Sequence, residues 1–212
     1  MINKSPGVSV HKDQEDSGLV MQIKQKLGLD SLYLIHRLDK VTSGLMVLAF
    51  HAEAAAELAE QFRNRKVEKY YLALSDRKPR RKQGLISGDM DKARRGAWKL
   101  LKTKNNPATT QFFSSSVRPG LRLFLLKPLT GKTHQIRVAL KSEGAPILGD
   151  PVYSSTQADR TYLHAYSLAF LLGGEEFRFN CLPDAGDYFD QECLELITSK
   201  YNQPENLNWP KC

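Results

Sequence analysis

The segment "LIHRLDKVTSGLMVLAF", residues 34–50, decides how the first part of the chain folds. It ends in an apolar run that is typical of a buried strand, and Leu38 directs the preceding chain toward the same core. Between them, Asp39 stands at the border between interior and surface. Taken alone, Asp39 is expected to cap the turn that follows, by accepting hydrogen bonds from the amides near Thr42 and Ser43.

The sequence outside this segment predicts further regular elements. Residues 52–66 are rich in Ala, Glu and Leu at helical spacing, and they separate two strands. Arg118-Pro119-Gly120 is a turn sequence between two apolar runs, which indicates an antiparallel hairpin. The remaining predictions are strands at 7–11, 67–75, 109–117, 121–127, 162–172 and 175–180, a helix at 133–144 with Thr133 as N-cap and Gly144 as stop, and a helix at 190–200. The pattern favours an α+β fold with a largely antiparallel sheet.

Composition points to a polyanionic partner. The 212 residues carry a net charge of +8, which suits nucleic acid or an anionic membrane surface. No apolar run approaches the roughly 20 residues of a membrane span, and the first residues do not resemble a cleavable signal, so we expect a cytoplasmic protein. The three cysteines lack metal-binding spacing and are expected to be reduced.

Positive charge is concentrated in residues 77–104. This segment holds eleven Lys or Arg residues against two Asp, an excess of nine positive charges. The segment is either a solvated loop or a loop that follows a phosphate backbone. Trp98 lies within it and either anchors the loop to the body of the protein or stacks on a base.

Two other stretches change the interpretation of Asp39. In "LTGKTHQIRVAL", residues 129–140, His134 and Arg137 are three positions apart and share one face of the predicted helix. In "EKYYLAL", residues 68–74, Tyr70 and Tyr71 are adjacent in a strand, so one faces the core and the other the opposite side.

With these motifs the sequence resembles the RluA-type RNA pseudouridine synthases. The resemblance rests on motifs in the family's order: "HRLDKVTSG" (36–44), "KYYLAL" (69–74), "GKTHQIRVAL" with "GAPILGDPVY" (131–153), and "LHA" (163–165). It implies a pseudouridine synthase catalytic domain over residues 1–212, of α+β class with a mixed, mainly antiparallel sheet in two subdomains. From the sequence we expect no N-terminal S4-type RNA-binding domain. It also implies isomerisation of uridine to pseudouridine within RNA, without cofactor or metal.

The resemblance assigns roles to individual residues. Asp39 matches the catalytic aspartate, Tyr71 the active-site tyrosine, and Arg137 the basic residue that pairs with the aspartate. Arg37 matches the arginine that fills the space left by the flipped nucleotide. Leu163 matches an aliphatic residue that lines the base pocket.

The chemistry gives reasons for these residue types. The reaction breaks the bond from C1′ to N1, turns the base and rejoins it through C5. An ionised carboxylate can attack C1′ or act on the sugar while the base leaves, and Arg137 is the candidate for keeping Asp39 ionised. The ring of Tyr71 can stack on uracil, and its hydroxyl is a candidate base. His36 is expected to be structural; His134 has a similar role or contacts RNA.

The expected partner is structured RNA, ribosomal or transfer, bound by a monomer. A uridine in such RNA must be extruded, which costs a few kcal/mol in lost stacking and pairing. Phosphate contacts from residues 77–104, which we expect to be a mobile loop, would offset this cost. The candidates for these contacts are Arg80, Arg81, Lys82, Arg94 and Arg95.

Two other function classes compete with this interpretation. A catalytically silent RNA-binding module would share the composition but would not need the aspartate, tyrosine and arginine, all of which are present. A basic nuclease or glycosidase would need a metal or paired carboxylates, and no second carboxylate stands at a comparable motif.

Overall fold

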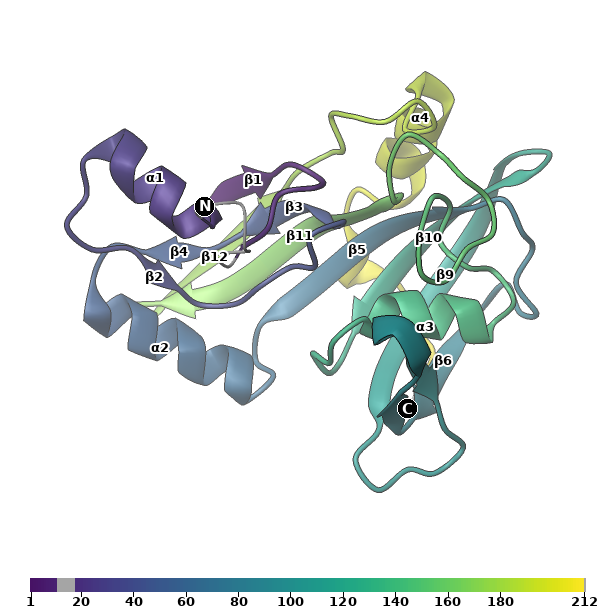
Figure 1. The fold of residues 1–212 in the computed structure, drawn as a ribbon, viewed down its shortest axis with the longest axis horizontal. Coiled ribbons are helices and arrows are strands. Elements are labelled where there is room, and N and C mark those ends of the chain that lie inside the picture. Colours follow the sequence, from purple (N-terminus) through teal and green to yellow (C-terminus); the bar gives the residue numbers. More distant parts are fainter. Residues whose placement is uncertain (11–17, 212) are drawn as a thin grey trace. The chain divides into compact units, whose positions relative to one another are not determined.

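The computed structural model describes residues 1–10 and 18–211, which form two compact units. Unit 1 consists of residues 1–69 and 164–181, and unit 2 of residues 70–163 and 182–212. Figure 1 labels the helices and strands of both except β7 and β8. Helices accompany mainly antiparallel strands in each unit, which confirms the predicted α+β class.

Unit 1 is built on strands in the order β1-β3-β11, with β12 on β11. β1 and β12 are antiparallel to their neighbours, and β3 runs parallel to β11. A small ladder joins β2 and β4. The elements are β1 (Ile2–Lys4), α1 (Leu19–Leu27), β2 (Tyr33–Leu34), β3 (Ser43–Met46), β4 (Leu48–Ala49), α2 (Ala52–Arg63), β11 (Leu163–Leu172, of which Leu163 belongs to unit 2) and β12 (Glu175–Asn180).

Apolar side chains from β3, α2 and β11 form the core of unit 1. Leu45, Leu58 and Leu168 are each at most 6% exposed and belong to one cluster. The Ala- and Glu-rich sequence of α2 favours a helix, and Leu58 lies on its buried side. The core therefore fixes the register of β3, which begins four residues after Asp39.

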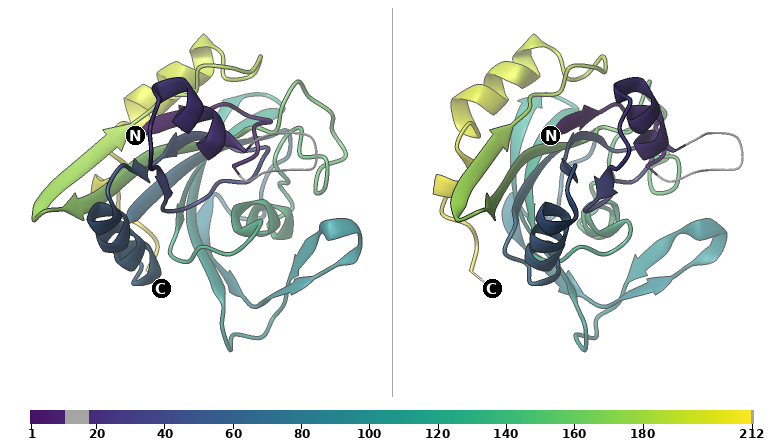
Figure 2. Two further views of the ribbon diagram at one scale, coloured as in Figure 1. Left: turned by 60° about the vertical axis from the view of Figure 1, so that its left-hand side comes forward. Right: turned by 90° about the vertical axis from the view of Figure 1, so that its left-hand side faces the viewer.

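Unit 2 is an antiparallel arrangement in the order β5-β10-β9-β6, with a separate β7–β8 hairpin. α3 packs against β8, β9 and β10. In Figure 2 the β7–β8 hairpin projects from the other strands of this unit. The elements are β5 (Glu68–Ser75, whose first two residues belong to unit 1), β6 (Gln83–Gly88), β7 (Met90–Lys92), β8 (Trp98–Leu100), β9 (Ala108–Arg118), β10 (Leu121–Pro128), α3 (Gln135–Ser142) and α4 (Gln191–Lys200), with 3-10 turns at Arg94–Gly96 and Pro204–Asn206.

The core of unit 2 lies between β5, β9 and β10. Leu72, Phe112 and Leu125 are fully buried. The predicted hairpin between β9 and β10 is confirmed, and Gly120 adopts φ +77 in its turn, a conformation that favours glycine. Asp190 caps α4 by accepting the Cys193 amide.

Several predicted elements are wrong in place or type. Residues 7–10 do not form a strand, and residue 11 lies outside the described part of the chain; the N-terminal strand is β1. The helix α1 was not predicted. The segment 77–104 is not one loop, because it contains β6, β7 and β8.

The prediction of Thr133 as a helix cap is also wrong. α3 begins at Gln135, and His134 precedes it in a left-handed conformation with φ +57. No side chain caps α3, and the side chain of Gln135 instead holds the loop before the helix: its Oε1 accepts the Lys132 amide at 3.0 Å and the Thr130 hydroxyl at 2.7 Å. Gly144 follows the helix end with φ +79, as a stop requires.

Within residues 1–10 and 18–211, no helix has the length and apolar character needed to cross a membrane. The same residues contain no group of three or more His, Cys, Asp or Glu side chains placed to hold a metal ion.

Candidate active site

Asp39 lies in a turn that leads into β3, and backbone hydrogen bonds fix this turn. The Thr42 amide donates to the main-chain carbonyl of Asp39 at 3.0 Å. The next carbonyl, of Lys40, accepts the Gly7 amide at 2.8 Å and the ammonium of Lys4 at 3.2 Å. Lys4 is 1% exposed, and its ammonium also donates to the carbonyls of Ser5 and Val8. The half-buried carboxylate of Asp39 therefore stands on a backbone with little freedom.

The residues after Asp39 fix where β3 begins. Gly44 has φ +107, and a Cβ at this position would lie 2.3 Å from the carbonyl oxygen of Ala165 in β11. Only glycine allows this approach. The Ser43 hydroxyl bonds to Nδ1 of His164 at 2.8 Å, and Nε2 of His164 lies 2.8 Å from the carbonyl of Cys181. His164 is fully buried, so its two hydrogen bonds join the start of β3 to the segment after β12.

His36 is a structural residue of unit 1. Its Nε2 accepts the Val47 amide at 3.1 Å, and its ring stacks on Phe62 at 4.5 Å. Burial, with a smaller contribution from the charge of Lys69, lowers the pKa of His36 to about 3. The ring is therefore neutral at pH 7, and because the Val47 amide can only donate, the proton of His36 is on Nδ1.

The two adjacent tyrosines of β5 face opposite sides, as predicted. Tyr70 is fully buried, 5.7 Å from the ring of Trp209 and 5.2 Å from the ammonium of Lys127. Tyr71 is half-buried and pairs in register with Leu126 of β10. The alternation of the strand turns Tyr71 away from the core side that holds Tyr70.

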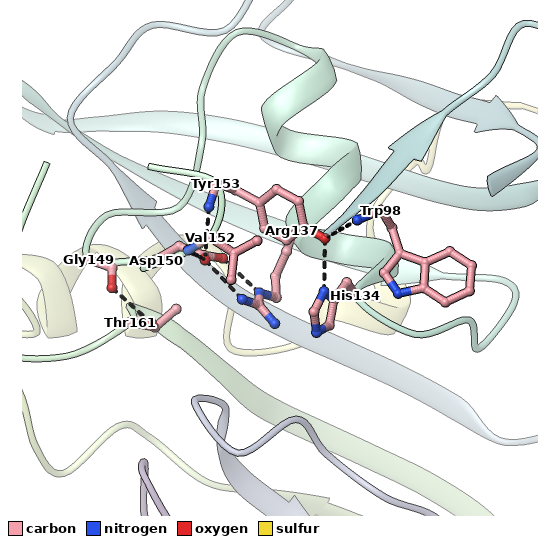
Figure 3. A network of polar contacts seen from close by, with 8 residues as sticks. All are labelled: Trp98, His134, Arg137, Gly149, Asp150, Val152, Tyr153 and Thr161. Atoms are coloured by element: carbon pink, nitrogen blue, oxygen red, sulfur yellow. Dashed lines mark hydrogen bonds and ion pairs between the residues drawn. The ribbon is translucent and has the colours of Figure 1, made fainter. Parts of the chain in front are cut away.

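Arg137 forms a buried ion pair within unit 2 (Figure 3). Its Nε donates to Oδ2 of Asp150 at 2.7 Å and its Nη2 to Oδ1 at 2.9 Å. The side chains are 4% and 0% exposed. The Tyr153 ring covers the guanidinium, with its centroid 5.0 Å from Cζ. A bidentate ion pair that is almost fully buried fixes the orientation of the Arg137 side chain.

Asp150 combines a turn with the ion pair. Its Oδ1 accepts the amides of Val152 at 2.9 Å and Tyr153 at 3.2 Å, which forms an Asx turn. The same carboxylate also neutralises Arg137, which its place before Pro151 did not indicate. Asp150 lies in the quoted motif "GAPILGDPVY", but the motif does not show that Asp150 pairs with Arg137, which is thirteen residues away.

His134 and Trp98 meet at the hydroxyl of Tyr153 (Figure 3). Nδ1 of His134 lies 2.8 Å from this oxygen, and the Trp98 amide donates to it at 2.8 Å. The indole of Trp98 is half-buried and points away from Tyr153. The backbone of Trp98 thus ties its segment to Tyr153, while the expected role of the indole, as an anchor or in stacking on a base, stays a prediction.

The other candidates have different surroundings. Leu163 is 3% exposed at the start of β11, whereas Arg37 is exposed. Among the phosphate-binding candidates, Arg81 forms an ion pair with the buried carboxylate of Glu143. Arg94 and Arg95 lie exposed at the tip of the β7–β8 hairpin.

The structure brings part of the predicted site together. His134 and Arg137 both contact Tyr153. Tyr71 and Leu163 belong to the same unit, unit 2. Asp39 and Arg37 belong to unit 1. A contact between Asp39 of unit 1 and Arg137 of unit 2 stays a prediction.

Comparison with known proteins identifies the family. The family model for RNA pseudouridylate synthase matches residues 1–142. An uncharacterized RNA pseudouridine synthase of Haemophilus influenzae is 56% identical over 191 residues, which cover 89% of this chain and 85% of that protein. The dual-specificity RNA pseudouridine synthase RluA of Escherichia coli is 36% identical over 141 residues, 63% of this chain and 64% of that enzyme, so the match spans just under two thirds of its length.

A solved structure agrees with the sequence comparisons. The human RNA pseudouridylate synthase domain containing 4 is 28% identical and has a TM-score of 0.72, with 92% of this chain and 88% of that chain covered. One family accounts for the architecture, for these matches, and for the motifs around Asp39, Tyr71 and Arg137. The chain belongs to the RluA-type RNA pseudouridine synthases, a family of isomerases that act on RNA.

Proposed function

We propose that this enzyme isomerises a specific uridine in structured ribosomal or transfer RNA, with Asp39, Tyr71 and Arg137 as its catalytic residues. It binds the RNA as a monomer in the cytoplasm and flips the target nucleotide out of its stack. The observation that carries the proposal is the placement of Asp39. Its carboxylate is half-buried on a turn whose backbone is held by Thr42, Gly7 and Lys4.

The reaction needs a carboxylate in this setting. The C1′–N1 bond of the uridine breaks, the C1′–C5 bond forms, C5 loses its proton and N1 gains one. Asp39 acts on the ribose while the base leaves, and this requires the ionised form. The ring of Tyr71 stacks on the freed uracil, and its hydroxyl takes part in moving the C5 proton.

Arg137 keeps Asp39 ionised in this proposal. A guanidinium carries five N–H donors, and the pair with Asp150 uses two of them. The bond to Asp150 therefore does not prevent Arg137 from serving a second carboxylate. Asp150 orients the guanidinium, and a pre-oriented donor stabilises charge more effectively than a mobile one.

Substrate binding depends on positive charge and on the space around the base. Arg37 occupies the position left by the flipped nucleotide, and Leu163 lines the pocket for the base. Phosphate contacts come from the basic residues of 77–104, of which Arg94 and Arg95 are exposed at a hairpin tip. These contacts offset the cost of flipping and weaken with salt.

Tritium release tests the proposal directly. Ribosomal and transfer RNA made with [5-³H]uridine in cells that lack the gene is incubated with the protein, because formation of the C1′–C5 bond expels the label from C5. Wild type is expected to release tritium, and Asp39→Asn to release none above background. The isosteric change removes the charge and keeps the shape of the side chain.

Asp30→Asn is the matched control. Asp30 is an exposed carboxylate of the same unit, and its replacement is expected to leave the rate unchanged. Activity of Asp39→Asn equal to wild type would exclude an aspartate-dependent mechanism at this residue. Binding of the RNA by wild type without any tritium release would instead support a silent binding module.

A further inference from the structure

The hydroxyl of Tyr153 joins three segments of unit 2 that are far apart in sequence. It accepts the Trp98 amide of β8 at 2.8 Å and lies 2.8 Å from Nδ1 of His134, the residue before α3. The Tyr153 amide donates to Asp150, the ion-pair partner of Arg137. One side chain thus connects the β7–β8 hairpin with the helix that carries Arg137 (Figure 3).

The donor fixes the direction of one of these hydrogen bonds. The Trp98 amide can only donate, so the Tyr153 oxygen accepts from it. The direction of the bond to His134 depends on the tautomer of the ring: Nδ1 accepts the tyrosine proton in the Nε2–H form and donates to the oxygen in the Nδ1–H form. Removing the hydroxyl therefore breaks both connections at once and leaves the amide of Trp98 without this acceptor.

The ring of Tyr153 has a separate role. It is 5% exposed and lies under two cationic groups, with its centroid 5.0 Å from Cζ of Arg137 and 5.4 Å from Nζ of Lys141. The ring thus supports α3, whereas the hydroxyl holds the hairpin. Phenylalanine at this position keeps the first function and removes the second.

The hairpin beyond Trp98 is exposed and basic. Lys92, Arg94, Arg95 and Lys99 are all exposed, and the tip closes through the Ala93 amide on the Ala97 carbonyl at 2.8 Å. At its base, Asp89 and Leu101 bond through their main chains at 2.7 Å. The Tyr153 hydroxyl holds β8 between this base and the tip.

We propose that the Tyr153 hydroxyl is a positioning group for RNA binding: it holds the basic β7–β8 hairpin in a fixed place relative to α3 and Arg137. This rests on the proposed function, in which the hairpin contacts phosphates. A hairpin held before binding pays less ordering entropy when RNA arrives, so its phosphate contacts contribute more to affinity. The hydroxyl acts through the hairpin and does not touch the reacting atoms.

A kinetic cycle tests this role with tritium release from the [5-³H]uridine-labelled RNA. Tyr153→Phe is expected to raise KM about fivefold, the size of one lost net hydrogen bond, and to change kcat less than twofold. In a background of Arg94→Gln and Arg95→Gln, the same change is expected to raise KM less than twofold. If the effect of Tyr153→Phe on KM disappears without the two arginines, the hydroxyl acts on RNA binding through the charges of the hairpin.

Tyr162→Phe is the matched control. The Tyr162 hydroxyl also accepts a backbone amide, that of Tyr188 at 3.0 Å, and bonds to Asp159, but it does not contact the hairpin. Loss of the Tyr162 hydroxyl is expected to lower the melting temperature by about as much as Tyr153→Phe does and to leave KM unchanged. A thermal melt on each variant makes this comparison.

Three results would overturn the inference. The first is an unchanged KM in Tyr153→Phe, and the second is an equal rise in KM with and without Arg94 and Arg95. The third is a Tyr153→Phe protein that no longer folds, because the hydroxyl would then serve stability and not RNA binding. Failure of the proposed function looks different. In that case wild type itself releases no tritium from any of the RNA.

Discussion

Replacing Asp150 by asparagine removes the charge that neutralises Arg137 and keeps the shape of the turn. The asparagine oxygen can still accept the amides of Val152 and Tyr153, which now bond to Oδ1 of Asp150. The guanidinium, only 4% exposed, loses its bidentate carboxylate. The effect on stability is therefore electrostatic and does not come from a collapsed turn.

The magnitude follows from the burial of both partners. Breaking a buried ion pair by removing one partner costs about 3–5 kcal/mol, because the other charge stays uncompensated. For a chain of this length, each kcal/mol lowers the melting temperature by about 2–4 °C. Asp150→Asn is thus expected to lower it by roughly 10 °C and to reduce tritium release as the orientation of Arg137 loosens.

Thermal and urea unfolding followed by circular dichroism measure this change. The control is Asp91→Asn, since Asp91 lies 3.6 Å from Lys99 in an exposed pair whose side chains are more than half exposed. Exposed pairs contribute little, so this midpoint is expected to stay unchanged. If Asp150→Asn unfolds at the wild-type midpoint, the buried pair does not hold Arg137 as argued here.

Three further changes test separate parts of the structure. His36 stays neutral in the native protein down to about pH 3, while the unfolded chain protonates it near pH 6.5. The free energy of unfolding should therefore decrease as the pH is lowered from about 6.5 to about 3, by up to about 1.4 kcal/mol per pH unit. His36→Gln should lose this part of the pH dependence, and equal slopes in the variant and wild type would contradict the burial of a neutral His36. Gly44→Ala should prevent folding or lower the midpoint far more than Gly120→Ala, because a Cβ at Gly44 would meet backbone at 2.3 Å whereas one at Gly120 would meet no atom within 4 Å; similar midpoints would refute the close approach. Replacing Arg94 and Arg95 by glutamine should weaken RNA binding and make the slope of log K against log salt less negative by about 1.5, and an unchanged slope would remove the hairpin from the binding surface.

Local signals in the sequence predicted much of the fold. The turn at Arg118–Gly120 and the two glycines at 173–174 each join neighbouring strands, so a short pattern is enough to indicate the hairpins. The helix α1 also had a usable signal, because Leu19, Ile23 and Leu27 recur at four-residue spacing before Gly28. Omitting this helix was an error of interpretation.

Contacts between distant segments could not be predicted in this way. The parallel pairing of β3 with β11 joins residues more than a hundred positions apart, and only the folded chain shows why residue 44 is glycine. The positive charge of residues 77–104 favours a loop and conceals three short strands. β6 buries Ile86 and pairs with β9, whereas β7 and β8 have no buried residue and depend on pairing with each other.

The site itself was predicted unevenly. Asp39, Tyr71 and Arg137 follow from motifs and from the chemistry that those side chains can perform. The roles of Asp150 and Tyr153 depend on bonds to Arg137 and Trp98, which are thirteen and fifty-five residues away. Such supporting contacts leave no periodic trace in a single sequence, although they determine the orientation of the groups that the motifs reveal.

The central claim is that Asp39 enables the chain to convert uridine in RNA to pseudouridine. Mapping every pseudouridine in ribosomal and transfer RNA tests it most directly, in cells with the gene, without it, and with the gene restored as wild type or Asp39→Asn. We predict that at least one pseudouridine disappears with the gene, returns with wild type and stays absent with Asp39→Asn. A map that does not change when the gene is removed, or that Asp39→Asn restores in full, would contradict the account.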